Sequence, residues 1–175
     1  MGEILFAAEE LERINNKLAA AIAADFAGVS SPLMLLGLLK GCQPFLSDLS
    51  RRLSDYHLPL VVDYLRVCSY VGTRSSGRVE ISFPTGKWQT PPEQVVVVDD
   101  IFDTGLTLKE VIAFLHRQGV RRVKSCVLLR KRGCSRVDFE PDYCGAEIPD
   151  AFVVGYGLDC DDKYRELPYI KILEE

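Results

Sequence analysis

The chain has 175 residues, 47% of them hydrophobic, which is enough for one domain, 1–175, with a substantial core. Lys and Arg total 21 against 25 Asp and Glu, a formal net charge of -4. This balance argues against a general nucleic-acid or membrane-surface binder, so we expect neither nucleic acid nor a membrane as partner.

The amino-terminal residues, MGEILFAAEELER, lack a positive segment followed by an unbroken apolar core, and no long apolar stretch follows. We therefore expect a cytoplasmic protein. The six cysteines form no C-x-x-C pair and are expected to be reduced: Cys42, Cys68, Cys126, Cys134, Cys144 and Cys160. The two histidines, His57 and His116, do not have zinc-ligand spacing, so a structural zinc site is not expected.

The first half of the chain alternates helical and strand patterns. Residues 7–27 carry apolar residues at three- and four-residue spacing and predict an amphipathic helix, and residues 32–39 predict a buried strand. A second helix is predicted around Phe45, Leu46, Leu49 and Leu53. Strands are predicted over 60–70 and 78–83, and the small and polar residues 71–77 between them form a candidate mobile loop.

Residues 94–108, QVVVVDDIFDTGLTL, hold the most informative pattern. The β-branched run Val95–Val98 suits a strand buried on both faces of a parallel sheet, with Asp99 and Asp100 at its carboxyl end, where such sheets bind ligands. The following Asp-Thr-Gly leads into a helix, whose free N–H groups can seat a phosphate. Carboxylates would repel a phosphate, so the acidic pair is better placed for sugar hydroxyls or Mg²⁺. An ordinary strand, Asp turn and helix cap is the alternative interpretation.

The rest of the chain continues the alternation. The helix after the turn carries Leu108, Val111, Ile112 and Leu115 and ends at Gly119. Further strands are predicted over 123–129, 152–156 and 169–173. Strands that alternate with helices through mostly short connections imply an α/β fold, with a mainly parallel central sheet covered by helices on both faces.

The acidic pair, the Asp-Thr-Gly and the Thr after it resemble the 5-phosphoribosyl pyrophosphate (PRPP) motif of the type I phosphoribosyltransferases. Residues 147–167, EIPDAFVVGYGLDCDDKYREL, are similar to the purine-binding segment of the hypoxanthine-guanine members. Leu-Lys-Gly at 39–41, Ser-Tyr at 69–70 and Lys-Arg at 131–132 also match, so the resemblance covers nearly the whole chain. It implies a type I phosphoribosyltransferase fold with a core of about 25–145 and a small hood from the amino-terminal segment and about 146–175.

The resemblance implies roles on the purine side. Asp103 is similar to the general base that interacts with purine N7. Lys131 is similar to the lysine that donates to the 6-oxo group, and adenine would present a donor there instead. Phe152 would stack on the base and Val153 would contact it through its backbone. The alternative interpretations are that Asp103 only caps a helix, that Lys131 is an ordinary surface lysine, and that Phe152 and Val153 are core residues.

The resemblance also implies a site for PRPP and Mg²⁺. The ribose and its phosphate would be held by Asp99, Asp100, Asp103, Thr104, Gly105, Leu106 and Thr107. Pyrophosphate would be bound by Arg165 and by Lys40 and Gly41, which resemble a loop that can hold a non-proline cis peptide in relatives. Asp99, Asp100 and Asp159 would lie at the metal, with Asp159 in the purine-binding segment, and Ser69 and Tyr70 would begin a lid that excludes water.

Some positions depart from the family pattern. Asp99 stands where Glu is frequent, Cys42 replaces the second Gly of the pyrophosphate loop, and Leu106 and Ala151 replace polar residues. None removes the expected base. The resemblance predicts a Mg²⁺-dependent purine salvage transferase that joins the 5-phosphoribosyl group of PRPP to N9 of hypoxanthine or guanine. A PRPP-sensing regulator or an enzyme preferring xanthine are the alternatives, and a homodimer or homotetramer is expected.

Overall fold

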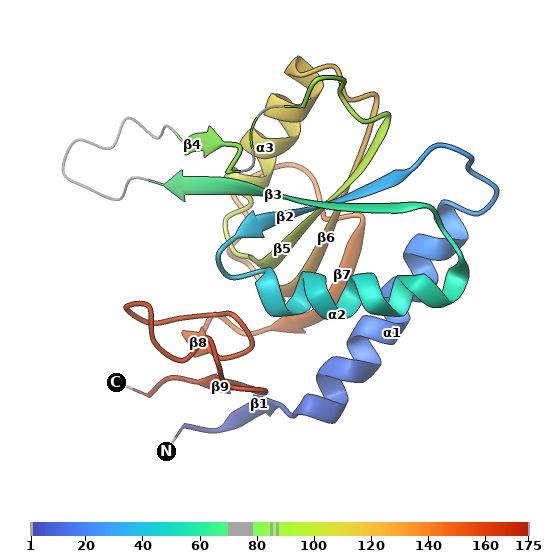
Figure 1. Cartoon of the computed structure of the whole chain (residues 1–175). Coiled ribbons are helices and arrows are strands. Elements are labelled where there is room, and N and C mark those ends of the chain that lie inside the picture. Colours follow the sequence, from blue (N-terminus) through green and yellow to red (C-terminus); the bar gives the residue numbers. More distant parts are fainter. Residues whose placement is uncertain (1, 70–78, 85, 87, 175) are drawn as a thin grey trace.

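The central feature of the fold is a six-stranded sheet, seen in a computed structural model that describes residues 2–69, 79–84, 86 and 88–174 (Figure 1). The strand order is β4-β3-β2-β5-β6-β7. The strands are β2 (Leu33–Leu39), β3 (Leu60–Ser69), β4 (Val79–Ser82), β5 (Gln94–Phe102), β6 (Arg122–Lys131) and β7 (Tyr143–Ile148). All neighbours are parallel except the antiparallel pair β3 and β4. The predicted mainly parallel α/β sheet is confirmed.

Helices cover both faces of this sheet. Helices α1 (Ala8–Asp25) and α2 (Gln43–Leu53) pack on one face, and α3 (Leu106–Arg117) packs on the other (Figure 1). On β5, Val96 and Val98 belong to the core under α1 and α2, whereas Val95 and Val97 belong to the core under α3. Successive strand side chains point to opposite faces, so a strand buried on both faces needs apolar residues at every position.

A second, three-stranded sheet brings the two ends of the chain together, in the order β1-β9-β8 (Figure 1). Its strands are β1 (Ile4–Phe6), β8 (Val153–Val154) and β9 (Ile170–Ile172), and both pairs are antiparallel. We call it the small sheet. Its pairing joins segments that lie at opposite ends of the sequence.

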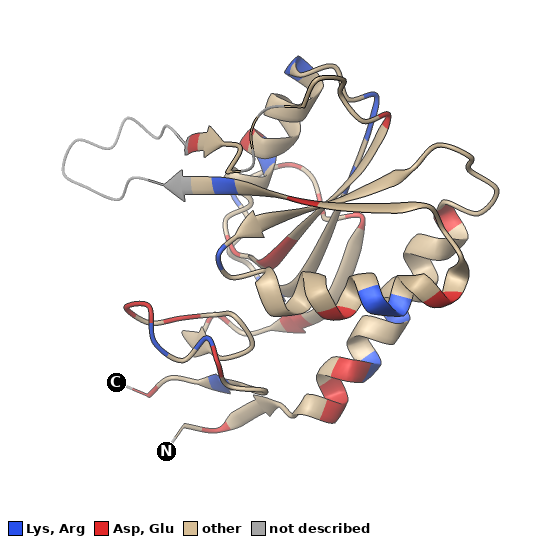
Figure 2. Ribbon diagram, viewed as in Figure 1, with Lys and Arg blue, Asp and Glu red and all other residues tan. Residues whose placement is uncertain are grey.

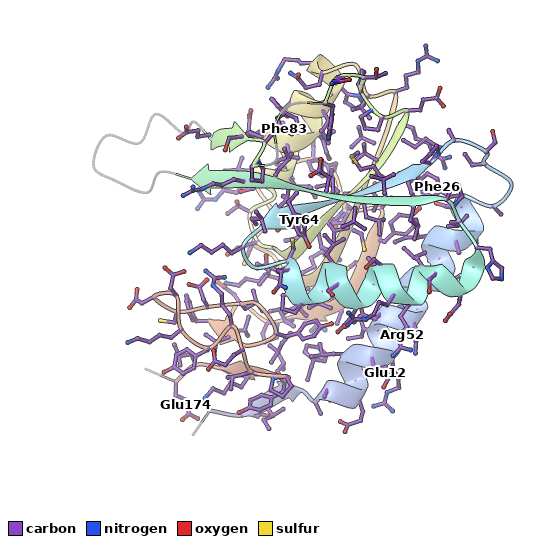
Figure 3. The ribbon with its side chains drawn as sticks, viewed as in Figure 1. Glu12, Phe26, Arg52, Tyr64, Phe83 and Glu174 are labelled. Atoms are coloured by element: carbon purple, nitrogen blue, oxygen red, sulfur yellow. The ribbon has the colours of Figure 1, made fainter. Side chains whose placement is uncertain are left out.

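A buried polar network fixes the small sheet to the helices. The hydroxyl of Tyr156, just after β8, donates to Asp48 of α2 at 2.5 Å and accepts from the side-chain amide of Asn15 of α1 at 3.1 Å. Asn15 is only 1% exposed and also donates to the Leu11 carbonyl. On the same two helices, Glu12 of α1 and Arg52 of α2 point toward one another and form an ion pair (Figure 3).

The structure corrects several predicted boundaries and adds elements that were not predicted. Strand β5 continues through the acidic pair to Phe102, α1 begins and ends within two residues of the prediction, and β8 is shorter than 152–156. The short 3-10 helix Ser54–Tyr56 and strands β1 and β7 were missed. The sequence of β7, YCGAEI, has only one β-branched residue, and β1 needs β9 from the far end of the chain to form at all.

The described residues bear on the expectations for the cysteines and for membrane-spanning segments. Cys42 and Cys126 are buried free thiols, in line with the expected reduced state of the cysteines. Within the described ranges, no helix is both long and apolar enough to cross a membrane. The predicted loop 71–77 and the predicted strand residues Tyr70 and Arg78 lie outside the described residues.

Candidate active site

A polar cleft lies at the carboxyl ends of β2 and β5. Its cavity has a volume of about 420 Å³, and it collects segments from four parts of the chain. The lining residues are Leu38, Leu39, Lys40, Gly41, Val67, Asp99, Asp100, Ile101, Phe102, Asp103, Thr104, Gly105, Thr107, Leu108, Asp159 and Arg165. Ligands of open α/β sheets bind at this edge. Most residues predicted to hold PRPP, pyrophosphate and metal are therefore brought together.

The acidic pair lies on the last part of β5, where Asp99 is in register with Val127 of β6. Burial and the neighbouring Asp100 carboxylate raise the pKa of Asp99 well above its usual range, and burial raises the pKa of Asp100 as well. Two adjacent carboxyl groups that are hard to ionise together are stabilised by a cation. The pair therefore fits Mg²⁺, which typically uses one or two carboxylates together with substrate phosphates.

A turn built for close packing follows the strand. Gly105 has a φ of 77° and is the residue before α3, and its carbonyl accepts from the Lys109 N–H at 3.0 Å. A Cβ on Gly105 would lie 2.5 Å from Val137 Cγ2, so both the backbone angle and the packing favour glycine. Thr107 and Leu108 of the first turn of α3 line the cavity, and the Leu106 N–H lies 3.5 Å from Thr104 Oγ1. The N–H groups of a first helical turn lack intrahelical partners and suit a phosphate. Leu106, 46% exposed, is not among the residues that line the cavity.

The candidate base and the candidate purine-side lysine are direct neighbours. Lys131 Nζ, at the end of β6, lies 3.3 Å from Asp103 Oδ2 and 3.0 Å from Asp150 Oδ1. Burial alone would lower the pKa of Lys131, but the carboxylates of Asp150 and Asp103 outweigh it and raise that pKa. Lys131 is therefore a charged donor at neutral pH, held between two acceptors.

The predicted base-contacting pair divides into one exposed and one buried side chain. Phe152 is 55% exposed, and its backbone carbonyl accepts from the Leu173 N–H at 2.9 Å. Val153 is 6% exposed and belongs to the core. The exposed Phe152 ring is available for stacking on a flat ligand. The Val153 side chain packs into the protein, so only its backbone could serve a ligand.

The loop after β2 contacts the acidic pair and the small-sheet segment at the same time. The peptide bond between Leu39 and Lys40 is cis. A Cβ on Gly41 would lie 1.6 Å from Asp100 Oδ2, and a Cβ on Gly157 would lie 1.9 Å from the Gly41 carbonyl oxygen. Gly41 therefore permits a close approach to the Asp100 carboxylate, and Gly157 permits a close approach to the Gly41 backbone, which a Cβ at either position would block.

Four charged residues beside this loop form what we call the ion cluster: Lys40, Asp159, Asp162 and Arg165. Arg165 Nη2 lies 2.8 Å from Asp159 Oδ1 and 3.1 Å from Asp162 Oδ1, and Lys40 Nζ lies 3.0 Å from that same Asp162 oxygen. The second Arg165 nitrogen, Nη1, donates to the Gly157 carbonyl at 2.8 Å. Figure 2 shows the mixed charges on the loop after β8.

Three site features were not found from the sequence. Asp150 and Asp162 each pair with a predicted functional cation, and Gly157 packs on Gly41. Asp162 stands in an acidic run with Asp161 and Asp159, which was the available signal, but a single sequence does not reveal which distant cation such a carboxylate meets. Of the predicted lid residues, Ser69 ends β3 and Tyr70 lies outside the described residues.

No group of three or more His, Cys, Asp or Glu side chains is arranged to hold a metal by itself in the part of the chain that the structure describes. The acidic pair and Asp159 line one cavity without forming such a group.

Comparisons with known proteins agree with this geometry. Residues 1–161 match the family model described as phosphoribosyl transferase domain. The chain is 39% identical over 173 residues to the hypoxanthine-guanine phosphoribosyltransferase of Staphylococcus aureus, covering 98% of this chain and 93% of the relative. It is 38% identical over 172 residues to the protein of that name from Staphylococcus epidermidis, with the same coverage.

Solved structures show the same similarity. A ternary substrate complex of a variant hypoxanthine phosphoribosyltransferase from Trypanosoma cruzi has a TM-score of 0.89 and 39% identity, covering 99% of this chain and 96% of that one. A hypoxanthine phosphoribosyltransferase from Staphylococcus aureus has a TM-score of 0.87 and 37% identity, covering 98% and 91%. The agreement extends over nearly the whole length of each pair.

Proposed function

The chain belongs to the phosphoribosyl transferase domain family, as a purine salvage transferase of its hypoxanthine-guanine group, and on this premise we propose how its cleft works. The reaction joins the 5-phosphoribosyl group of PRPP to N9 of hypoxanthine or guanine and releases pyrophosphate. IMP or GMP is the product.

The observation that carries this proposal is the contact between Asp103 and Lys131. Asp103 lines the cavity beside the turn before α3, and its carboxylate lies 3.3 Å from Lys131 Nζ. A 6-oxopurine offers N7 and a 6-oxo group on adjacent sides of one ring system. We assign Asp103 to N7, where it eases loss of the ring proton as N9 bonds to the ribose carbon, and Lys131 to the 6-oxo oxygen.

The opposite end of the substrate requires anion binding. The N–H groups at the start of α3, with Thr104 and Thr107, suit the 5-phosphate, and Lys40, Gly41 and Arg165 suit the departing pyrophosphate. Asp99, Asp100 and Asp159 would hold Mg²⁺, which when bound neutralises charge on the pyrophosphate. The residues of the chain orient the reactants and place positive charge against the leaving group, from which we expect most of the rate enhancement.

The remaining parts of the proposal concern the surroundings of the reaction. Phe152 stacks on the base and Val153 meets it through its backbone, while Ser69 and Tyr70 begin a lid that keeps water from the reacting carbon. We propose one catalytic domain over 1–175, with its hood formed by the two terminal segments. We also propose that the protein forms a homodimer or homotetramer and that it is located in the cytoplasm. Size-exclusion chromatography with light scattering and cell fractionation test the last two points.

Pyrophosphate release from PRPP and Mg²⁺, with hypoxanthine, guanine, xanthine and adenine supplied separately, tests the proposal. Turnover with hypoxanthine and guanine is expected, with adenine inactive because its amino group cannot accept from Lys131. PRPP binding without release for any base would point to a regulator, and turnover with xanthine alone would reassign the acceptor.

A further inference from the structure

The ion cluster contains a carboxylate that the reaction does not need. Lys40 and Arg165, the two side chains assigned to pyrophosphate, both contact the same oxygen, Oδ1 of Asp162, at 3.0 and 3.1 Å. One oxygen held between an ammonium and a guanidinium has the surroundings that a phosphate oxygen would have. Lys40 and Arg165 line the cavity, whereas Asp162 does not, so the carboxylate reaches the two cations from outside the cavity.

The charges around the cluster are balanced before any ligand enters. Lys40 and Arg165 supply two positive charges, and Asp159 and Asp162 supply two negative ones. Hydrogen bonds from Lys40, and then from Arg165, lower the pKa of Asp162, so its carboxylate is ionised at neutral pH. An incoming pyrophosphate therefore meets cations that are already neutralised, and it must share them or displace Asp162.

The Lys40–Asp162 contact is exposed on both sides and is therefore exchangeable. The side chains of Lys40 and Asp162 are 67% and 70% exposed, and ion pairs of this kind are weak in water. A pyrophosphate carries several negative charges and can accept two hydrogen bonds from the Arg165 guanidinium, so it competes well against a single carboxylate.

We propose that Asp162 is an internal counter-anion, which occupies the pyrophosphate-binding cations in the free protein and weakens the binding of PRPP and pyrophosphate. This inference rests on the proposed function, since it takes Lys40 and Arg165 as the pyrophosphate-binding groups. The consequence for turnover is faster release of the pyrophosphate product, because Asp162 recovers its two partners as the product leaves.

The backbone around Asp162 does not depend on its side chain. Reciprocal hydrogen bonds between Cys160 and Lys163, at 3.2 and 3.1 Å, close the turn, and the Asp162 N–H donates to Asp159 Oδ2 at 2.9 Å. Asp161 and Asp162 have φ values of 53° and 60°, a region that asparagine tolerates well. An Asp-to-Asn change at either position therefore keeps the turn and removes only the charge.

The test compares Asp162→Asn with the matched variant Asp161→Asn. Asp161 is its exposed neighbour in the same turn, and it makes no ion pair with any residue that the structure describes. Calorimetric titration with pyrophosphate in the presence of Mg²⁺ measures the dissociation constant directly. We expect Asp162→Asn to bind pyrophosphate about two- to fivefold more tightly, the range set by a weak exposed ion pair, and Asp161→Asn to match the unaltered protein.

Each other outcome has a defined meaning. Weaker or unchanged pyrophosphate binding in Asp162→Asn would overturn the inference, since weaker binding would show that Asp162 positions the two cations rather than competing for them. Equal tightening in both Asn variants would reduce the effect to net charge and would also overturn it. If the unaltered protein binds neither pyrophosphate nor PRPP with Mg²⁺, the proposed function itself fails, and that failure appears before any variant is compared.

Product inhibition by pyrophosphate provides a second test of the same inference. With hypoxanthine and PRPP as substrates, the inhibition constant of pyrophosphate should be about two- to fivefold lower in Asp162→Asn, and the KM for PRPP should fall by a similar factor, because Asp162 weakens the binding of both. The KM for hypoxanthine should not move, because among the described residues no ion pair joins Asp162 to Asp103 or Lys131. A change confined to the KM for hypoxanthine would contradict the assignment.

Discussion

Along β5 and the first turn of α3, one continuous stretch supplies the acidic pair, the candidate base and the phosphate seat, whereas the facing wall takes Lys40 and Arg165 from distant parts of the chain. The first wall is fixed by the sheet register and by the helix start. The second exists only when the loop after β2 meets the segment after β8, which are 122 residues apart at the contact of Lys40 with Asp162. Local sequence therefore sets the acidic pair and the start of α3, whereas long-range packing sets the contact of Lys40 with the segment after β8.

The largest effect is expected from the local wall. Asp103→Asn keeps the shape of the turn but removes the base, and turnover should fall about 100- to 10,000-fold, the usual contribution of general acid-base catalysis. PRPP binding should be largely spared, which calorimetry checks. Asp138→Asn, at an exposed position in the neighbouring loop, is the control. Unchanged turnover in Asp103→Asn would remove the base assignment.

The contact between the two walls is the next most sensitive point. Gly41→Ala would bring its Cβ to 1.6 Å from Asp100 Oδ2, so the loop or the carboxylate must move. Overpacking of this kind costs about 1–3 kcal/mol, so PRPP affinity should fall roughly 5- to 150-fold, measured by calorimetry with Mg²⁺.

Gly28→Ala is the control for Gly41→Ala. Gly28 has a φ of 75°, but a Cβ there would have no atom within 4 Å, so it tests a substituted glycine without a clash. This control should lose some thermal stability while PRPP affinity stays the same. Equal losses of affinity in both variants would show that the Gly41 contact has no special role.

A smaller effect on hypoxanthine binding is expected at Lys131, which contacts both Asp103 and Asp150. Asp150→Asn removes one of the two acceptors that position Lys131, so the KM for hypoxanthine should rise about fivefold, while the KM for PRPP stays unchanged. Steady-state kinetics with each substrate varied in turn separates the two. An equal rise in both KM values would indicate a general loss of structure.

The same variant should change how stability depends on pH. The pKa of Lys131 is raised above its ordinary value of 10.5, so its stabilising contribution is complete below that value and is lost as pH rises through the raised pKa. Removing Asp150 should move this loss to lower pH. Denaturant unfolding of the two proteins from about pH 9 to pH 12, a range that spans the loss above 10.5, would show it, and identical profiles would contradict the pairing.

Much of the fold followed from local patterns. The four-valine run predicted a doubly buried strand because its alternate residues pack under different helices, and the spacing of Leu11, Leu18 and Ile22 predicted α1. Strands β1 and β7 were missed, because their stability comes from partners rather than from their own composition. Gln94–Phe102 also runs longer than its apolar pattern, since pairing with β6 carries the strand through the acidic residues.

The sequence by itself determined the family, the parallel sheet and the 99–107 segment, because neighbours in sequence are also neighbours at a strand end and a helix start. Tertiary structure alone decided that Lys131 lies between Asp103 and Asp150, that Gly41 packs on Asp100 and Gly157, and that Asp162 occupies Lys40 and Arg165. The physical reason is that such contacts depend on how distant segments pack together. A single sequence does not reveal which distant residue a charged side chain will contact.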